Sequence, residues 1–221
     1  MLGQRIVSRK VIGDWLKSEE TNGSRYSRDN IVIAKGSGVL ITGTVLALLS
    51  VGAALASLEV DNTGNGTIAA GAVGAGAQLG TYRIVFTSAT AFNVTDPSGD
   101  AVGSAGTVGT AFNSGGVSFT ITAGSTAFAA GDEGAITVDP GSGKYVPFDP
   151  AGTGGAEVAK GILVEDVDAT DANKDVAGAA VVRHAHIAPS GLTFKVAATD
   201  AEQAAALASL RSQGILTVRE A

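Results

Sequence analysis

The sequence predicts a mainly β protein: a small, split α+β core with one C-terminal helix, interrupted by an inserted antiparallel β-sandwich. Short segments alternate apolar and polar residues with a period of two, which is typical of half-buried strands. Many of the 31 glycines fall between these segments, where turns need positive φ. One segment near the C-terminus changes to a helical period, so a single helix is expected there.

The first 30 residues are predicted to form an extended polar arm. Its strong apolar anchors are Val11, Ile12, Trp15 and Leu16, which bury too little area for the arm to order alone. Residues 1–36 hold seven basic and four acidic side chains, net +3, which leaves −9 for the rest of a chain of net charge −6. Such an arm is either a basic element that steers a partner or a solvated tail, and both interpretations stay open.

Residues 31–60 and 140–221 are interpreted as the two halves of the core. The strands expected in them cover residues 31–34, 43–49, 144–148, 158–164, 177–186 and 215–218. Thr199 and Glu202 have the spacing of a capping box, and Gly214 is suited to end the helix that follows. Ala204, Leu207, Ala208 and Leu210 are expected to line one face of this helix.

One uncharged stretch, residues 39–58, is long enough to span a bilayer as a helix. Gly43, Gly52 and several β-branched residues favour extended structure instead, and no cluster of basic residues flanks the stretch. A buried strand with a connector is therefore the favoured interpretation, with a membrane span as the lesser alternative.

Residues 61–139 are predicted to form the inserted sandwich, because surface loops tolerate long insertions at little entropic cost. Its strands show one apolar face each. The residues on these faces are Tyr82, Ile84, Phe86, Phe92, Val94, Val117, Phe119, Ile121, Ile136 and Val138.

Residue types that carry chemistry are sparse, so we expect no enzyme activity and no cofactor. The two histidines, His184 and His186, would share one face of a strand and could bind a metal, but a polar strand end is the favoured reading. The chain has no cysteine and no Gly-x-Ser-x-Gly motif, which excludes thiolate sites and a nucleophile elbow. The acidic body argues against direct binding to nucleic acid.

Three motifs resemble the head decoration proteins of tailed phages, typified by phage lambda. Residues 15–28 read WLKSEETNGSRYSR, which is similar to the family's L-S-E-A-N-G-x-R-S-R opening, with Glu-Thr in place of Glu-Ala. Residues 43–46 (GTVL) resemble its first core strand. Residues 143–149 (GKYVPFD) and 159–163 (AKGIL) resemble its K-x-V-x-[WF]-D and G-I-L pair. The resemblance covers residues 12–50 and 140–221.

The resemblance implies a structural virion protein, made in the bacterial cytoplasm, that binds the outside of the expanded capsid as a homotrimer and stabilises it. Its partners would be the major capsid protein, at three-fold and quasi-three-fold sites, and other copies of itself, with no nucleic acid or membrane. The expected capsid contacts are Trp15, Leu16, Asn22, Arg25, Tyr26 and Arg28. The expected core and trimer region contains Tyr145, Phe148, Ile162, Leu207 and Leu210.

The alternative function is a virion-surface adhesin whose middle sandwich binds glycans. Glycan sites need exposed aromatic rings beside polar groups. Because Tyr82, Phe86, Phe92 and Phe119 lie on the apolar strand faces, they are expected to be core residues. The adhesin is therefore the second choice.

Overall fold

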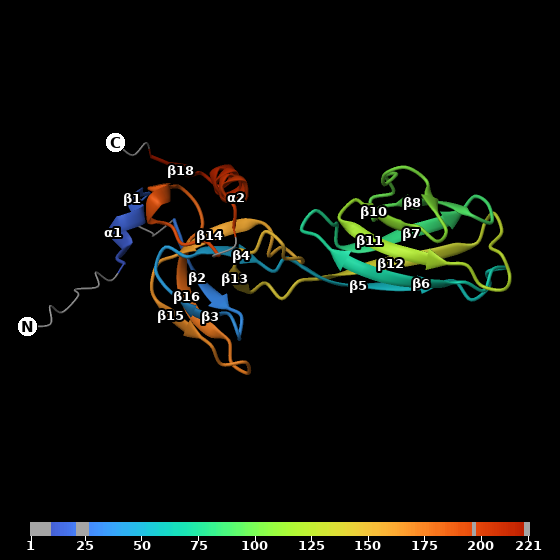
Figure 1. Cartoon of the computed structure of the whole chain (residues 1–221), viewed down its shortest axis with the longest axis horizontal. Coiled ribbons are helices and arrows are strands. Elements are labelled where there is room, and N and C mark those ends of the chain that lie inside the picture. The colour runs from blue at the N-terminus through green and yellow to red at the C-terminus, as the bar shows by residue number, and fades with distance from the viewer. Residues whose placement is uncertain (1–9, 21–26, 196–197, 219–221) are drawn as a thin grey trace, which may run out of the picture. The chain divides into compact units, whose positions relative to one another are not determined.

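The computed structural model describes residues 10–20, 27–195 and 198–218, and it divides the chain into two compact units (Figure 1). Unit 1 comprises Met1–Leu48, Lys144–Gly152 and Ala156–Ala221, and unit 2 comprises Leu49–Gly143 and Thr153–Gly155. Both are built mainly from strands, and the long helix lies near the C-terminus. The predicted fold class is thereby confirmed.

The centre of unit 1 is a closed five-stranded barrel, whose strands follow the order β13-β2-β16-β14-β4. These strands are β2 (Arg28–Ile33), β4 (Val45–Leu48), β13 (Tyr145–Pro147), β14 (Ala159–Leu163) and β16 (Val176–Val181). β13 pairs with β2 in parallel, and the other pairs are antiparallel. Closure gives every strand a paired neighbour on both sides.

Smaller elements surround the barrel of unit 1. A three-stranded sheet has the order β1-β17-β18, and a two-stranded sheet pairs β15 with β3. The bounds are β1 (Leu16–Glu19), β3 (Gly38–Leu40), β15 (Val167–Ala169), β17 (Ala185–Ile187) and β18 (Ile215–Thr217). The helices are α1 (Ile12–Trp15), the 3-10 helix η1 (Pro189–Gly191) and α2 (Asp200–Ser212).

Helix α2 begins and ends where the sequence predicts. The Thr199 side chain accepts a hydrogen bond from the Glu202 backbone N–H, and the Glu202 carboxylate accepts one from the Thr199 N–H. Gly214 follows the helix with φ 77°. The predicted face is wrong in part: Leu210 is buried and Leu207 half-buried, but the second buried position is Ala206 rather than the exposed Ala204 and Ala208.

Unit 2 is a sandwich of a five-stranded sheet, β5-β12-β7-β8-β9, and a three-stranded sheet, β10-β11-β6. The first contains β5 (Val51–Leu58), β7 (Gly80–Phe86), β8 (Ala91–Thr95), β9 (Gly106–Thr107) and β12 (Glu133–Pro140). The second contains β6 (Thr67–Val73), β10 (Ala111–Ser114) and β11 (Val117–Thr122). All pairs within both sheets are antiparallel.

The predicted strand faces of unit 2 meet in a single core between its sheets. Tyr82, Ile84 and Phe86 of β7 are buried, whereas Arg83 and Thr87 are exposed. The same alternation is confirmed for β8, β11 and β12, whose predicted inward-facing residues all join this core. The period of two therefore identified the buried side of each of these strands.

The beginning of unit 2 differs from the predicted boundary at residue 61. β5 pairs with β12 along its length, for example Ala56 with Ile136, so it belongs to unit 2 and not to the core. The uncharged stretch 39–58 accordingly supplies three strands: β3, β4 and β5. Among the residues that the structure describes, no helix has the length and apolar character needed to cross a membrane.

The buried carboxylate of Asp132 joins two loops at one end of unit 2. Its Oδ1 accepts the backbone N–H of Thr63 at 2.9 Å, and its Oδ2 accepts those of Gly64 at 2.9 Å and Ala129 at 3.0 Å. The hydrogen bond from Ala129, followed by those from Thr63 and Gly64, lowers the pKa of Asp132 from its ordinary value of 3.8. The ionised form therefore holds the two loops together.

Replacing Asp132 by asparagine should lower the melting temperature of unit 2 at neutral pH, because the amide places a donor against backbone donors. A lowered folded-state pKa gives stability that is present above 3.8 and is lost as pH falls through the folded pKa. The difference in melting temperature between Asp132→Asn and the wild type should therefore narrow below pH 3.8. Thermal melts at neutral pH and at a pH below 3.8 would check this prediction. The control is Asp61→Asn, which changes an exposed carboxylate in the same way. An equal difference at both pH values would contradict the assignment.

Candidate functional site

The segment expected to be a free arm is built into unit 1 over its described part. β1 pairs antiparallel with β17, so that Leu16 faces Ile187 and Ser18 faces His186. The expectation that this segment buries too little to order alone is therefore wrong for residues 10–20. Its partner strand lies more than 160 residues further along the chain, which is why local sequence gave no sign of the pairing.

Trp15 is the reason that this segment docks on unit 1. Its side chain is fully buried in a cluster with Val45, Phe148 and Ile187. The indole Nε1 donates a hydrogen bond to Thr42 Oγ1 at 3.1 Å, so the one polar atom of the ring is also satisfied. The ring is thus a core element of the folded chain and has no surface to offer to a partner.

The structure describes only some of the other residues that are expected to contact the capsid. Asn22, Arg25 and Tyr26 lie outside the described residues, and their contact with a capsid stays a prediction. Leu16 is half-buried at the start of β1. Arg28 Nε and Nη2 bond the two carboxylate oxygens of Glu19, so its guanidinium already has an acidic partner within unit 1.

A buried hydroxyl joins the two described residues on either side of residues 21–26. Ser27 Oγ accepts the backbone N–H of Glu20 at 3.0 Å and lies 2.8 Å from the His184 carbonyl oxygen, to which it can donate. The Glu20 N–H to His184 carbonyl bond, at 3.1 Å, ties the same three residues. The ends of the β1–β2 connection are therefore held together on unit 1.

The three-stranded sheet beside this junction presents one exposed row of side chains. Ser18, His186 and Leu216 are paired across β1, β17 and β18, and Ser18 Oγ lies 2.9 Å from His186 Nδ1. A shallow pocket of about 480 Å³ lies over this row. Its lining comprises Ser18, Glu19, Glu20, His184, Ala185, His186, Gly214 and Leu216.

His184 and His186 do not lie on one strand, contrary to the prediction. β16 ends at Val181 and β17 begins at Ala185, so residues 177–186 form two strands rather than one. His184 lies between them in the left-handed region, with φ 45°. Within the described parts of the chain, no group of three or more histidine, cysteine or acidic side chains is placed to hold a metal ion.

The residues expected in the core and trimer region lie together on unit 1. Phe148, Ile162 and Leu210 are buried in one cluster, and Leu207 packs against it from α2. Tyr145 is half-buried beside the neighbouring cluster. These residues thus lie in or beside the core of unit 1. Their contact with other copies stays a prediction, and of the five only Leu207 and Tyr145 have exposed side-chain area for such a contact.

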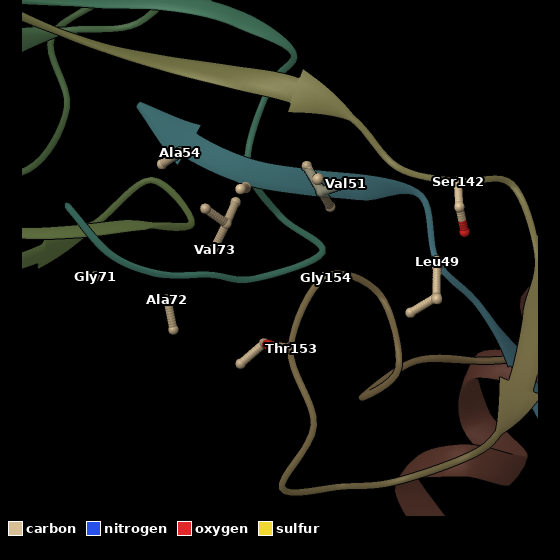
Figure 2. A pocket seen from close by; sticks show the side chains of 11 residues that line it. Leu49, Val51, Ala54, Gly71, Ala72, Val73, Ser142, Thr153 and Gly154 are labelled. Atoms are coloured by element: carbon tan, nitrogen blue, oxygen red, sulfur yellow. The ribbon is translucent and has the colours of Figure 1, made fainter. Parts of the chain in front are cut away.

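A pocket of about 450 Å³ lies on unit 2 between β5, β6 and the short segment around Gly154 (Figure 2). Gly154 N–H donates to the Val73 carbonyl at 2.8 Å, and its carbonyl accepts the Val51 N–H at 3.2 Å. Figure 2 shows mostly small apolar side chains around the opening, with Ser142 and Thr153 supplying the hydroxyls. None of the lining residues is ionisable, so the pocket offers no acid or base for catalysis.

The aromatic rings of unit 2 are all buried, as expected of core residues. They are Tyr82, Phe86, Phe92, Phe112, Phe119 and Phe128. Phe86 and Phe128 stack with ring centroids 4.0 Å apart. Since unit 2 is described throughout, it presents no exposed ring on which a sugar could stack, and no observation favours the adhesin.

Comparison with known proteins gives one family. The family described as "Bacteriophage lambda head decoration protein D" matches residues 6–215. A search of curated proteins finds no match.

Among solved structures, similarity is found to flagellar junction proteins. FlgL of Xanthomonas campestris is 26% identical over 46% of this chain, with a TM-score of 0.33. FlgL of Legionella pneumophila is 15% identical over 47%, with a TM-score of 0.32, and FlgK of Burkholderia pseudomallei is 20% identical over 59%, with a TM-score of 0.34. The chain spans 33%, 37% and 24% of those three proteins, and likeness at such TM-scores carries no argument about fold or function.

Proposed function

The chain belongs to the bacteriophage lambda head decoration protein family, whose members are structural proteins of the phage capsid, and on that premise we propose that it binds the outside of the expanded capsid as a homotrimer and stabilises the shell. The observation that carries this proposal is the family match, which spans residues 6–215 and therefore includes both units. The major capsid protein is the proposed partner.

Unit 1 is the proposed docking part. The family-like motifs at residues 43–46, 143–149 and 159–163 contribute to the barrel strands β4, β13 and β14. β4 lies between the other two, with its Leu46 opposite Gly161 and Pro147. The motif at residues 15–28 supplies Trp15 to the core of the same unit. These motifs are distant in sequence and contiguous in space, which supports one docking module formed by unit 1.

The charge of the chain is divided unequally between the two units. Unit 2 contains one basic residue, Arg83, and seven acidic ones, so its net charge of −6 equals that of the whole chain and unit 1 is neutral. The acidic residues are Glu59, Asp61, Asp96, Asp100, Asp132, Glu133 and Asp139. Because three neutral docking units repel one another less than acidic ones would, a trimer through unit 1 is the favoured arrangement.

Two measurements on the full-length protein test the proposal. Sedimentation equilibrium should give the mass of three copies, and expanded, undecorated capsids should withstand a higher temperature after the protein is added. Trimers bind through several weak contacts at once, so occupancy should saturate at a low protein concentration. A monomer in solution, together with shells whose melting does not change, would overturn the proposal.

A further inference from the structure

A polar notch on the barrel of unit 1 has a composition that points to a ligand. Its volume is about 350 Å³. It is lined by Asp29, Leu48, Tyr145, Lys160, Val182, Arg183 and Gln213. Strands β2, β4, β13 and β14 all contribute, together with the residues that follow β16 and α2. The notch therefore stands on a closed barrel, which is a rigid support for a binding site.

Lys160 occupies an irregular position in the barrel. Along β14, Ala159 pairs with Ala47 and Gly161 with Leu46, so two steps of β14 stand against one step of β4. Lys160 is the extra residue of this bulge. Bulges re-aim the side chain that they carry and are common beside functional sites. The irregularity thus lies at the one lysine of the notch.

Among the charged side chains that line the notch, Lys160 is the one without an ion-pair partner in the described parts of the chain. Arg183 bonds both carboxylate oxygens of Asp29, which neutralises that pair. The half-buried Lys160 makes no side-chain hydrogen bond or ion pair with any residue that the structure describes. Burial, and then the charge of Asp29, raises the pKa of Tyr145, whereas Arg183 lowers it, so the phenol stays protonated and can donate.

We propose that this notch binds a carboxylate, the acidic side chain of a residue on the major capsid protein. Lys160 supplies the charge, and the Tyr145 hydroxyl supplies a second donor. A single unpaired ammonium matches one negative charge, and the Arg183–Asp29 pair adds no net charge, so a doubly charged phosphate would be only half neutralised. The inference rests on the proposed capsid docking and names the chemistry of one contact within it.

Charge complementarity also distinguishes the unit that would receive a carboxylate. Unit 2, at −6 and with its one arginine paired to Glu133, repels an acidic group. Unit 1 is neutral overall and holds Lys160. The alternative occupant, an acidic residue of another copy of this chain, is separated from the capsid by the experiment below.

The test compares Lys160→Gln with Lys174→Gln, a matched loss of one charge at an exposed lysine of the same unit. Titrated onto expanded, undecorated capsids, Lys160→Gln should bind about tenfold more weakly, as expected for a lost charge-assisted hydrogen bond. Lys174→Gln and Lys160→Arg should bind like the wild type. Added salt should narrow the gap between Lys160→Gln and the wild type. Melting temperatures would confirm that the variants fold.

Coupling of amines to carboxylates by a carbodiimide identifies the occupant. In wild-type complexes, mass spectrometry should find Lys160 joined to an acidic peptide of the capsid protein. A link only to a peptide of this chain, or equal binding by Lys160→Gln and the wild type, would overturn the inference and leave capsid docking intact. Failure of the wild type itself to bind would overturn the proposed function, and this inference with it.

Discussion

Replacing Trp15 by alanine should destabilise unit 1 by about 3–5 kcal/mol, the usual cost of truncating a buried aromatic side chain. The ring is fully buried among barrel strands and η1, and its loss also leaves Thr42 Oγ1 without its donor. Urea denaturation followed by circular dichroism would measure the change. Since most small domains have only about 5–15 kcal/mol of stability, this loss should remove a large share of the free energy of unfolding of unit 1.

The control for this variant is Val11→Ala, at an exposed position of the same segment. It should change the free energy of unfolding by less than about 0.5 kcal/mol. Should Trp15→Ala prove as stable as the wild type, residues 10–20 would not belong to the core, and a free arm would again be the better description. For the same reason, a deletion of residues 1–28 does not remove a free arm alone. It removes Trp15 and β1 and therefore damages the fold of unit 1.

Replacing Phe92 by alanine should cost unit 2 about 3–5 kcal/mol. Phe92 is fully buried, with ring centroids 5.8, 6.1 and 5.7 Å from those of Phe86, Phe112 and Phe119. Gly106 packs so closely on this ring that even one added methyl group would overlap it. The truncation therefore leaves a cavity between the two sheets.

The single tryptophan of the chain lies in unit 1, so its fluorescence reports that unit alone. Phe92→Ala should lower the denaturation midpoint seen by circular dichroism and leave the fluorescence midpoint unchanged. Leu55→Ala, at an exposed position of β5, is the control and should have little effect. If unit 1 docks on the capsid, Phe92→Ala should still bind it; loss of binding would assign docking to unit 2 instead.

Local periodicity was enough to predict much of both units. The alternation of Tyr82, Ile84 and Phe86 identified β7 and its buried side, because a strand with one wet face must alternate. The Thr199–Glu202 spacing placed the start of α2, since capping depends on residues only three apart. The capsid family followed from short motifs that the barrel brings together.

Long-range pairing and small residues explain the errors. Nothing near Trp15 shows that β17 will pair with its segment, so a core residue resembled the anchor of a free arm. β5 consists of small or aliphatic residues without a polar period, and its place was decided by pairing with β12. In α2, alanines lie on every side, so periodicity could not choose Ala206 over Ala204.

The central claim is that this chain decorates a phage head through a trimer. The most direct measurement is electron cryomicroscopy of expanded, undecorated capsids mixed with the full-length protein. The account predicts three copies around each three-fold and quasi-three-fold site, with unit 1 against the shell. Bare shells at saturating protein, or density in which unit 2 makes the contact, would contradict it.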